Sequence, residues 1–424
     1  MSIFKQEHTG MIQRKVLRFG KAQSTLCLAT AMLLSACTNG SLQTTPEAWA
    51  DRPASSEVEY LERLRLIQGR EQFEYDTMVD VPGAGAQSAR LPDIDAGSVA
   101  PAAVEEAIQY AEKTDSLALL VWHDGKLIAE SYFQGETATS QLNGKSFPKA
   151  LSSVAVGRAI ALGDINSLDQ SVADYVQEWQ GTPKAAITIR HALTMHTGLL
   201  EQGFDFSKDS PFPRAYLDPY HGRYIVDEYP LTHKPGERFA YSNAASDLIA
   251  IIIERATGRE YEEFVGNELL KPINAPGGRV WLNREGGLAH SGCCLELPAQ
   301  TWLKLGLLLS NDGMAEGKRL LPEGYVAQMR TPSLDNPHYG LALWLGSPFL
   351  EKRGFLGTKS NPTGVYHSAP YLAEDVFLFD GNGNQVTYII PSKDLVIVRM
   401  GSGAPEGVTW DNAALPNAIL RGIN

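Results

Sequence analysis

The chain of 424 residues is 43% hydrophobic and 20% charged, which is ordinary for a soluble globular protein and excludes collagen-like, mucin-like and largely disordered sequences. Its 49 acidic and 37 basic residues give a formal net charge of −12, so the surface repels phosphate and nucleic-acid binding is not expected. Four cysteines are too few for a disulfide scaffold, and none is spaced as Cys-x-x-Cys, the pairing typical of a zinc site.

The N-terminus carries the pattern of a targeting segment. Basic residues are frequent up to Lys21, and the apolar stretch 24–37 is too short to span a bilayer comfortably. It ends in Leu34-Ser35-Ala36-Cys37, which resembles the lipobox of bacterial lipoproteins. The resemblance implies a signal peptide at residues 1–36 and lipidation of Cys37; a plain secretory signal or a buried apolar helix is the alternative. Because residue 38 is Thr rather than Asp, the sorting habit of lipoproteins favours the outer membrane, facing the periplasm.

Residues 37–96 are rich in Pro, Ser, Thr, Glu and Gly. We expect a lipidated N-terminus followed by a linker, with one helical piece at residues 58–72. The linker would hold the rest of the chain off the membrane surface. Residues 97–424 are expected to form one domain. The sequence shows no repeat at solenoid periods and no later apolar run long enough for a membrane span.

The predicted elements of this domain place strands at both ends of a helical middle. Asp124-Gly125 between two apolar runs is typical of a tight hairpin turn, and Pro148 suits the first turn of a helix. Because the strands come from distant segments, we predict an α+β fold, an antiparallel β-sheet flanked by helices with an inserted, mostly helical region. In chain order we expect a helix (102–113), a hairpin (117–133), a helix (146–163), a helical region (165–335), two strands (385–390 and 395–400) and a closing helix (412–420).

The first candidate for chemistry is Ser146-Phe147-Pro148-Lys149. Residues three apart on a helix share a face, so the Lys149 amine can lie beside the Ser146 hydroxyl. A serine hydroxyl is a weak nucleophile that needs a nearby base, and a buried lysine with a lowered pKa can help to supply one. Ser-x-x-Lys occurs by chance about once in a chain of this composition. The position of Ser146, after a hairpin and at the start of an apolar-faced helix, singles it out.

The second candidate is Tyr241-Ser242-Asn243. A tyrosinate near an ammonium group can act as general base toward the serine and later as general acid toward the leaving group. Asn243 can orient the lysine and hold a substrate carbonyl. The alternative is structural: a buried tyrosine followed by the N-cap of a helix at residues 244–257.

The order and spacing of these motifs resemble the class C β-lactamase-like serine hydrolases, a superfamily that also contains D,D-peptidases, esterases and 6-aminohexanoate-dimer hydrolases. Ser-x-x-Lys precedes Pro-Gly-Glu-Arg-Phe-x-Tyr-Ser-Asn by about 95 residues. Further stretches look like the same superfamily, namely 165–175, 187–199, 305–313 and the terminal strand pair. The resemblance spans roughly residues 100–424 and implies the fold and the machinery without fixing a substrate.

Carried over to this chain, the resemblance implies that Ser146 is the acylated nucleophile and Lys149 its activating partner. Tyr241 would be the general acid and base, and Asn243 would position the lysine and the substrate. The backbone N–H of Ser146 would be one donor to the oxyanion of the tetrahedral intermediate. No cofactor is implied.

The third motif of the superfamily differs here. Penicillin-recognising members place Lys-Thr-Gly or His-x-Gly on the strand that lines the site, whereas the corresponding stretch 379–385 has no cation. That cation normally pairs with the carboxylate of a β-lactam or a D-Ala terminus, so its absence favours a neutral ester or amide. Two registers are open, Gly381-Asn382-Gly383 and Asn382-Gly383-Asn384, and they make Asn384 or Gln385 the second backbone donor. The alternative is a hairpin turn with no catalytic part.

The remaining candidates are interpreted as structural. Cys293-Cys294 is read as a buried pair, with a vicinal disulfide as the alternative in an oxidising periplasm. His191 and His196 are read as structural, and because no His/Asp cluster with metal-ligand spacing is found, no metal is expected.

Taken together, the sequence predicts a membrane-anchored serine hydrolase that cleaves a small ester or amide through an acyl-enzyme on Ser146. The first alternative is a β-lactamase or D,D-carboxypeptidase, and the second is a non-catalytic, penicillin-binding-like module. The expected partners are a small-molecule substrate and, through the lipid anchor only, the membrane. The oligomeric state is not predicted.

Overall fold

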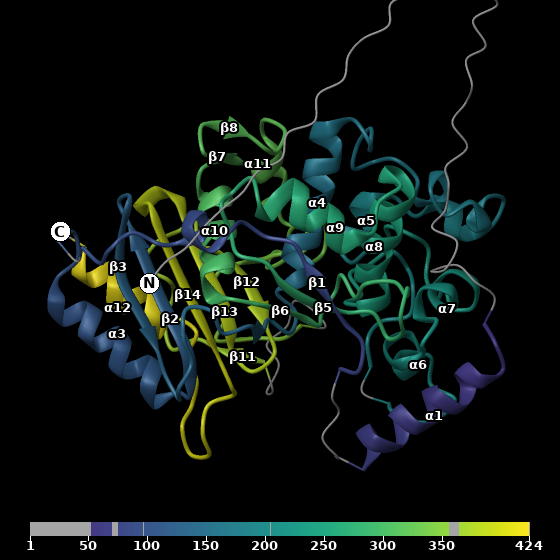
Figure 1. The fold of residues 1–424 in the computed structure, drawn as a ribbon, viewed down its shortest axis with the longest axis horizontal. Coiled ribbons are helices and arrows are strands. Elements are labelled where there is room, and N and C mark those ends of the chain that lie inside the picture. Colours follow the sequence, from purple (N-terminus) through teal and green to yellow (C-terminus); the bar gives the residue numbers. More distant parts are fainter. Residues whose placement is uncertain (1–51, 70–74, 96, 204, 356–363, 424) are drawn as a thin grey trace, which may run out of the picture. The chain divides into compact units, whose positions relative to one another are not determined.

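The computed structural model describes residues 52–69, 75–95, 97–203, 205–355 and 364–423 (Figure 1). The predicted signal peptide and Cys37 lie outside the described residues. Among the helices of the described ranges, none is both long enough and apolar enough to cross a bilayer.

Six antiparallel strands form the main sheet, which joins the two ends of the domain (Figure 1). Its hairpin turns at Asp124-Gly125, where both residues have positive φ, as a tight two-residue turn requires. Val398 lies opposite Leu120 on one side and opposite Thr387 on the other, so the last strand sits between segments from both ends. In sheet order the strands are β3 (Lys126–Tyr132), β2 (Ser116–His123), β14 (Leu395–Gly401), β13 (Gln385–Ile390), β12 (Phe377–Gly381) and β9 (Trp344–Leu345).

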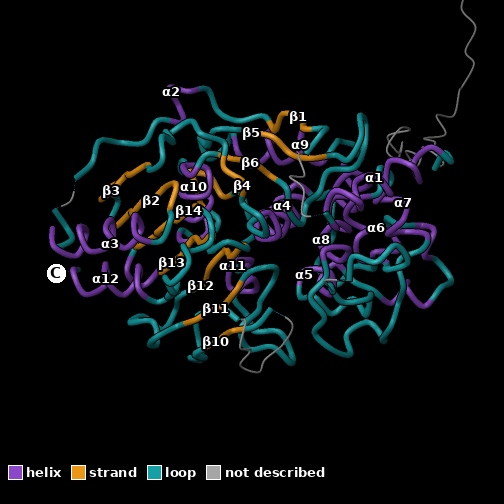
Figure 2. The backbone as a smooth tube through the Cα atoms, turned by 90° about the horizontal axis from the view of Figure 1, so that it is seen from below, coloured by secondary structure: helices purple, strands orange, loops and turns teal. Residues whose placement is uncertain are grey.

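Both faces of this sheet are covered, which explains why its strands are apolar runs rather than alternating patterns. Helices α3 (Pro101–Lys113) and α12 (Ala414–Gly422) lie side by side on the face toward which Leu119 points (Figure 2). Helix α10 (Ala299–Ser310) packs on the opposite face, where the next residue, Leu120, belongs to a second hydrophobic cluster. This arrangement confirms the predicted α+β fold with an antiparallel sheet flanked by helices.

The region between β3 and β9 is mostly helical and contributes three strands to a second sheet, whose fourth strand, β1 (Met78–Val81), precedes β2 in the chain. The strand order of this sheet is β1, β5 (Gly278–Trp281), β6 (Leu295–Leu297) and β4 (Leu142–Asn143). The helices are α4 (Pro148–Leu162), α5 (Ile189–Leu193), α6 (Pro211–Leu217), α7 (His221–Asp227), α8 (Asn243–Thr257), α9 (Tyr261–Val265) and α11 (Tyr325–Met329), with a π-helical turn at Gly266–Leu270. Two short strand pairs form separate two-stranded sheets: β7 (Met314–Ala315) with β8 (Lys318–Arg319), and β10 (Lys352–Arg353) with β11 (Val365–Tyr366).

Helices α4 and α8 pack against each other in the core of this region. Both end at a glycine in the left-handed conformation, Gly163 after α4 and Gly258 after α8, which stops each helix where the apolar pattern stops. The side chain of Ser242 accepts a hydrogen bond from the Ala245 N–H and caps α8. The helix N-cap that the sequence analysis gave as the structural alternative is therefore present, and it is Ser242.

The segment before the main domain is more ordered than the sequence analysis expected. Helix α1 (Ser55–Gln68) buries Tyr60 and Leu64 against Leu217 and Trp281, and β1 pairs with β5. Within residues 37–96, the parts that the structure describes therefore include elements packed on the domain rather than a plain linker. The physical reason is that Tyr60 and Leu64 fall one turn apart on α1, and together they bury apolar surface.

Candidate active site

Ser146 lies in a tight turn immediately before α4. Lys145 has a φ of 53°, and its N–H donates to Asn143 Oδ1 at 2.9 Å. The helix starts at Pro148, two residues later than predicted, because the chain is still turning at Ser146. The half-buried Ser146 side chain is thereby presented at the N-terminal end of α4.

Lys149, in the first turn of α4, brings its amine to Ser146 and to two further acceptors. Lys149 Nζ lies 3.2 Å from Ser146 Oγ, 2.7 Å from Asn243 Oδ1 and 2.6 Å from the Gly292 carbonyl oxygen. Its side chain is buried, and this burial lowers the pKa of Lys149 to about 7, although the charge of Asp247 acts in the opposite direction. A large fraction of the amine is then neutral at neutral pH and able to accept a proton.

Tyr241 lies over the same amine, with its ring centre 5.1 Å from Lys149 Nζ. Burial raises the pKa of Tyr241 above its ordinary value of 10, while a side-chain hydrogen bond with Ser146 acts to lower it. The phenol is therefore protonated at neutral pH. This favours a proton donor at Tyr241 in the resting state, rather than the tyrosinate that the sequence analysis considered.

Asn243 is the first residue of α8, so its side chain is fixed by the same helix start that Ser242 caps. Its amide oxygen accepts from Lys149, which orients the amine toward Ser146. The structure thus brings Ser146, Lys149, Tyr241 and Asn243 together from two segments about 95 residues apart.

A cavity of about 370 Å³ opens beside Ser146 and Tyr241. Its walls combine aromatic rings with neutral amides and one pair of opposite charges. The lining residues include Trp344, Arg353, Phe355, Asp380, Asn382 and Trp410.

The third motif forms one edge of this cavity. Strand β12 ends at Gly381, paired with Gln385, so Asn382-Gly383-Asn384 is the hairpin turn, with positive φ at Gly383 and Asn384. The turn reading is therefore right, yet all three turn residues also line the cavity. Gln385 is different: it is buried, and its side chain bonds the Gly401 backbone. The side chain of Gln385 thus stabilises the sheet by bonding to the backbone of β14.

Gly381 packs against the loop that carries Ser146. A methyl group at Gly381 would lie 2.5 Å from the Gly144 carbonyl oxygen and 3.1 Å from the Ser146 backbone nitrogen. Only glycine permits this contact between strand and loop. Asp380 and Asn382, the neighbours of Gly381, both line the cavity, and the two predicted registers of the third motif stay predictions.

An ion pair in the cavity was missed by the sequence analysis. Arg353, on β10, is buried, forms an ion pair with Asp380 and lies with its guanidinium carbon 3.9 Å from the Trp344 ring centre. Burial raises the pKa of Asp380, and the Arg353 charge opposes that shift. Asp380 belongs to the third motif, but nothing in the sequence pairs that motif with residue 353.

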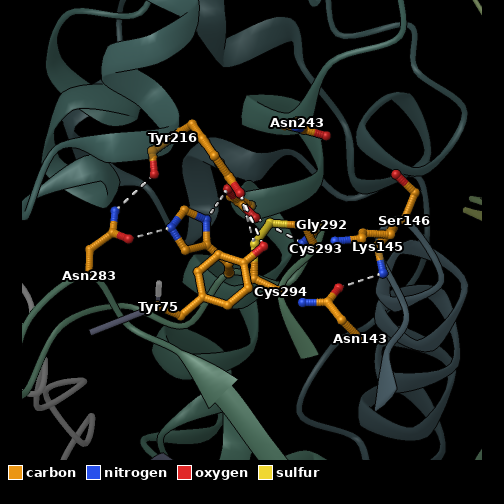
Figure 3. Close-up of a disulfide and its surroundings, with 12 residues drawn as sticks. Tyr75, Asn143, Lys145, Ser146, Tyr216, Asn243, Asn283, Gly292, Cys293 and Cys294 are labelled. Atoms are coloured by element: carbon orange, nitrogen blue, oxygen red, sulfur yellow. Dashed lines mark hydrogen bonds and ion pairs between the residues drawn. A yellow bond between two sulfur atoms is a disulfide. The ribbon is translucent and has the colours of Figure 1, made fainter. Parts of the chain in front are cut away.

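Cys293 and Cys294 form a vicinal disulfide, which was the alternative reading of this pair. Cys294 is buried, and the pair directly follows Gly292, whose carbonyl accepts from Lys149. Figure 3 shows the disulfide with Gly292, Asn243 and Ser146 around it.

The fold also creates a buried His/Asp cluster that the sequence analysis did not find. His221, Asp247 and His290 each offer a ligand atom, and these atoms lie within 4.8 Å of one another. The two imidazole rings, however, are stacked 3.9 Å apart and nearly parallel, so no ion can lie in the plane of both. Both nitrogens of His290 already face hydrogen-bond partners. We interpret the cluster as a hydrogen-bond network rather than a metal site.

His191 and His196 lie outside the cavity. His191 completes the capping box of α5 with Thr188, and His196 bridges the Thr194 carbonyl and Asp335. These contacts agree with the structural reading of both histidines.

Comparison with known proteins places the chain in a family. A family profile described as Beta-lactamase matches residues 102–416. The 6-aminohexanoate-dimer hydrolase of Paenarthrobacter ureafaciens is 26% identical over 258 residues, which is 57% of this chain and only 60% of that protein's own length.

Solved structures share the fold. A Bacillus anthracis protein assigned to the 6-aminohexanoate-dimer hydrolases superposes with a TM-score of 0.62 over 89% of this chain and 95% of its own, at 19% identity. A family VIII carboxylesterase superposes with a TM-score of 0.58 over 78% of this chain and 99% of its own, at 14% identity. The chain belongs to the Beta-lactamase family, within the superfamily of β-lactamase-like serine hydrolases.

Proposed function

We propose that this protein is a serine hydrolase that cleaves a small, neutral ester or amide through an acyl-enzyme on Ser146. The observation that carries the proposal is the buried amine of Lys149, 3.2 Å from Ser146 Oγ, with a pKa lowered to about 7. A lysine held only for stability would gain from an acidic partner, yet the atoms that Lys149 Nζ bonds are neutral.

The reaction follows from this geometry. The neutral amine of Lys149 takes the hydroxyl proton as Ser146 Oγ attacks the carbonyl carbon. The Ser146 N–H and a backbone N–H just after Gly381 stabilise the oxyanion. The Tyr241 phenol gives its proton to the departing alcohol or amine and recovers one from Lys149. Water then attacks the ester carbonyl of the acyl-enzyme and gives a proton to the neutral Lys149 amine, which passes it to Ser146 Oγ as the bond between Oγ and the carbonyl carbon breaks.

The cavity favours a substrate without net charge. Its aromatic walls, Trp344, Phe355 and Trp410, suit an apolar acyl or leaving group. The one cation that lines the cavity in the described ranges, Arg353, is already paired with Asp380. The names of the relatives, a 6-aminohexanoate-dimer hydrolase and a family VIII carboxylesterase, support a hydrolase of small substrates and, for the second, an ester.

A β-lactamase or D,D-carboxypeptidase is the second candidate, because Arg353 brings a guanidinium into the cavity. Such a substrate carries a carboxylate, which would have to displace Asp380 from Arg353. A module that binds substrate without turning it over is the third candidate, since the fold alone does not fix turnover.

We further propose that the protein is lipidated at Cys37 and faces the periplasm from the outer membrane. The lipobox-like sequence carries this proposal, and a disulfide at Cys293–Cys294 suits an oxidising compartment. Mass spectrometry of the mature N-terminus from a membrane fraction tests it. A diacylated or triacylated Cys37 is expected, and an unmodified residue 37 in that fraction would contradict it.

Intact-mass analysis tests the chemistry. The protein is exposed to p-nitrophenyl butyrate, a p-nitroanilide and a chromogenic cephalosporin, with Ser146→Ala as the control. We expect a transient butyryl adduct on the parent, none on Ser146→Ala, and release of p-nitrophenol only by the parent. Turnover of the cephalosporin alone supports the second candidate, and an adduct that never clears supports the third. Equal hydrolysis by Ser146→Ala contradicts the nucleophile.

A further inference from the structure

Of the three hydrogen bonds that Lys149 Nζ makes, the one to the Gly292 carbonyl is the shortest. Gly292 is itself held in place by its neighbours. Gly292 N–H donates to Asp247 Oδ1 at 2.9 Å, while its carbonyl accepts from Lys149 Nζ at 2.6 Å. Gly292 thus links a buried carboxylate on α8 to the amine on α4. A methyl group at residue 292 would lie 2.7 Å from the Ser246 side chain, so only glycine allows the loop to approach α8 this closely.

The neighbours of Gly292 are fixed as well. Ser291 Oγ donates to the Ser246 carbonyl at 2.9 Å and accepts from the Ala250 N–H at 3.2 Å. On the other side, the Cys293–Cys294 disulfide limits the backbone. Asp247 itself is 2% exposed, so its contact with Gly292 is made in a region without water competition.

The second oxygen of Asp247 is held by His290, and Asn283 fixes the orientation of that ring. Asn283 Nδ2 donates to the backbone carbonyls of Tyr216 and Asp218, which turns Asn283 Oδ1 toward His290 Nε2 at 3.0 Å. His290 therefore donates from Nε2. Its Nδ1 lies 3.0 Å from Asp247 Oδ2, so a hydrogen bond joins the imidazole to the carboxylate.

Three titratable side chains around this pair are uncharged at neutral pH. Burial holds the pKa of His221, whose ring is stacked on His290, well below its ordinary value. Tyr216 and Tyr261 also face Asp247, and burial raises the pKa of each phenol above its ordinary value. The charge of Asp247 reaches Lys149 as well, where it acts to raise the pKa of the amine.

We propose that Asp247, with His290 as its partner, is a positioning residue that holds the Gly292 carbonyl where it keeps Lys149 in line with Ser146. The proposal rests on the proposed hydrolase function. Asp247 touches no reacting atom; it acts through the Gly292 N–H on the geometry of the amine and through its charge on the protonation of that amine.

Two substitutions separate these effects. Asp247→Ala removes the acceptor of the Gly292 N–H, and we expect kcat for p-nitrophenyl butyrate to fall at least tenfold with KM changed less than threefold. Asp247→Asn keeps an oxygen for Gly292 and removes the charge, so it should recover most of kcat. Because the Asp247 charge raises the pKa of Lys149, its loss lowers that pKa. The acid limb of the kcat profile then moves to lower pH by about half a unit.

Asp218→Asn is the matched control. Asp218 is an equally buried carboxylate, but its partners are the Tyr220 N–H, Arg52 and Arg214. We expect this variant to lose thermal stability while its pH profile stays like that of the parent. A parent-like kcat and pH profile in both Asp247 variants would overturn the proposal.

Nuclear magnetic resonance keeps the test decisive even if Asp247→Ala does not fold. In ¹⁵N-histidine-labelled parent protein, His290 should carry a proton on Nε2, bonded to Asn283, and its Nδ1 should be hydrogen-bonded to Asp247; both signals are assigned by their loss in His290→Gln. A His290 ring without a proton on Nε2 overturns the proposed pair. An inactive parent that forms no adduct on Ser146 instead refutes the hydrolase function and leaves the His290 spectrum as a separate result.

Discussion

The pH dependence of acylation follows directly from the surroundings of Lys149. Burial lowers the pKa of this amine from 10.5 to about 7, and only the neutral amine can take the Ser146 proton. With that pKa, about 9% of the amine is neutral at pH 6 and about 91% at pH 8. We therefore expect kcat/KM for a neutral ester to rise about tenfold between these two values and then to level off. An unperturbed lysine would be neutral in only about 1 molecule in 3,000 at pH 7.

Replacing Asn243 tests whether the titrating group is Lys149. In Asn243→Asp a carboxylate takes the place of an amide oxygen 2.7 Å from Lys149 Nζ, which favours the ammonium form. The folded-state pKa of Lys149 should rise by about one to two units, and the acid limb should move to higher pH by the same amount. The matched variant Asn243→Ala loses the acceptor and adds no charge, so its acid limb should stay near that of the parent while its rate falls.

The assay is single-turnover acylation by a p-nitrophenyl ester, read at the isosbestic wavelength of p-nitrophenol so that the detection does not depend on pH. A profile that is flat from pH 6 to 8, or that climbs steadily to pH 10, would refute the assignment of Lys149 as a lowered-pKa base. A limb in Asn243→Asp that coincides with that of the parent would show that another group titrates.

Three further predictions follow from the site. Reduction of Cys293–Cys294 with a phosphine, followed as a gain of two hydrogens in intact mass, should lower kcat severalfold and leave KM nearly unchanged, because the Gly292 carbonyl then loses one constraint. Gly381→Ala should reduce kcat/KM by more than about a hundredfold, since a methyl group 2.5 Å from the Gly144 carbonyl must push the strand or the nucleophile loop aside; near-parent kinetics would contradict the contact. Asp380→Asn frees the Arg353 guanidinium, so esters with a carboxylate in the acyl group should gain rate relative to neutral ones, which competition assays with paired substrates measure.

The fold was largely predictable because its signals are local. The Asp124-Gly125 turn, the apolar runs of the terminal strands and the helix ends at glycine each follow from a few neighbouring residues. The four-stranded sheet was not predicted, because its strands are two to four residues long and their partners lie far apart in the chain. The docking of α1 was missed for a related reason. Tyr60 and Leu64 become informative only once Leu217 and Trp281 are known to lie opposite them.

The proximity of Ser146, Lys149, Tyr241 and Asn243 was predictable because these residues sit in two compact motifs with a recognisable spacing. The structure adds what lies between the motifs. Arg353 enters the cavity from β10, and no pattern in the sequence connects it with Asp380. The packing of Gly381 against the Ser146 loop was not predicted either, since it is a contact with the backbone of another segment. A contact between backbone atoms is visible in a sequence only as a small residue at that position.

The same reasoning explains how the protein keeps an amine neutral in its interior. Desolvation alone would let Lys149 point to any available carbonyl, and a mobile amine would be a poor base for one particular hydroxyl. The acceptors fix its direction: Asn243 Oδ1 is set by the start of α8, and the Gly292 carbonyl is set by Asp247 on the same helix. One helix therefore supplies both constraints on the amine of another. A change in how α4 and α8 pack should consequently alter the proton transfer before it alters the shape of the substrate cavity.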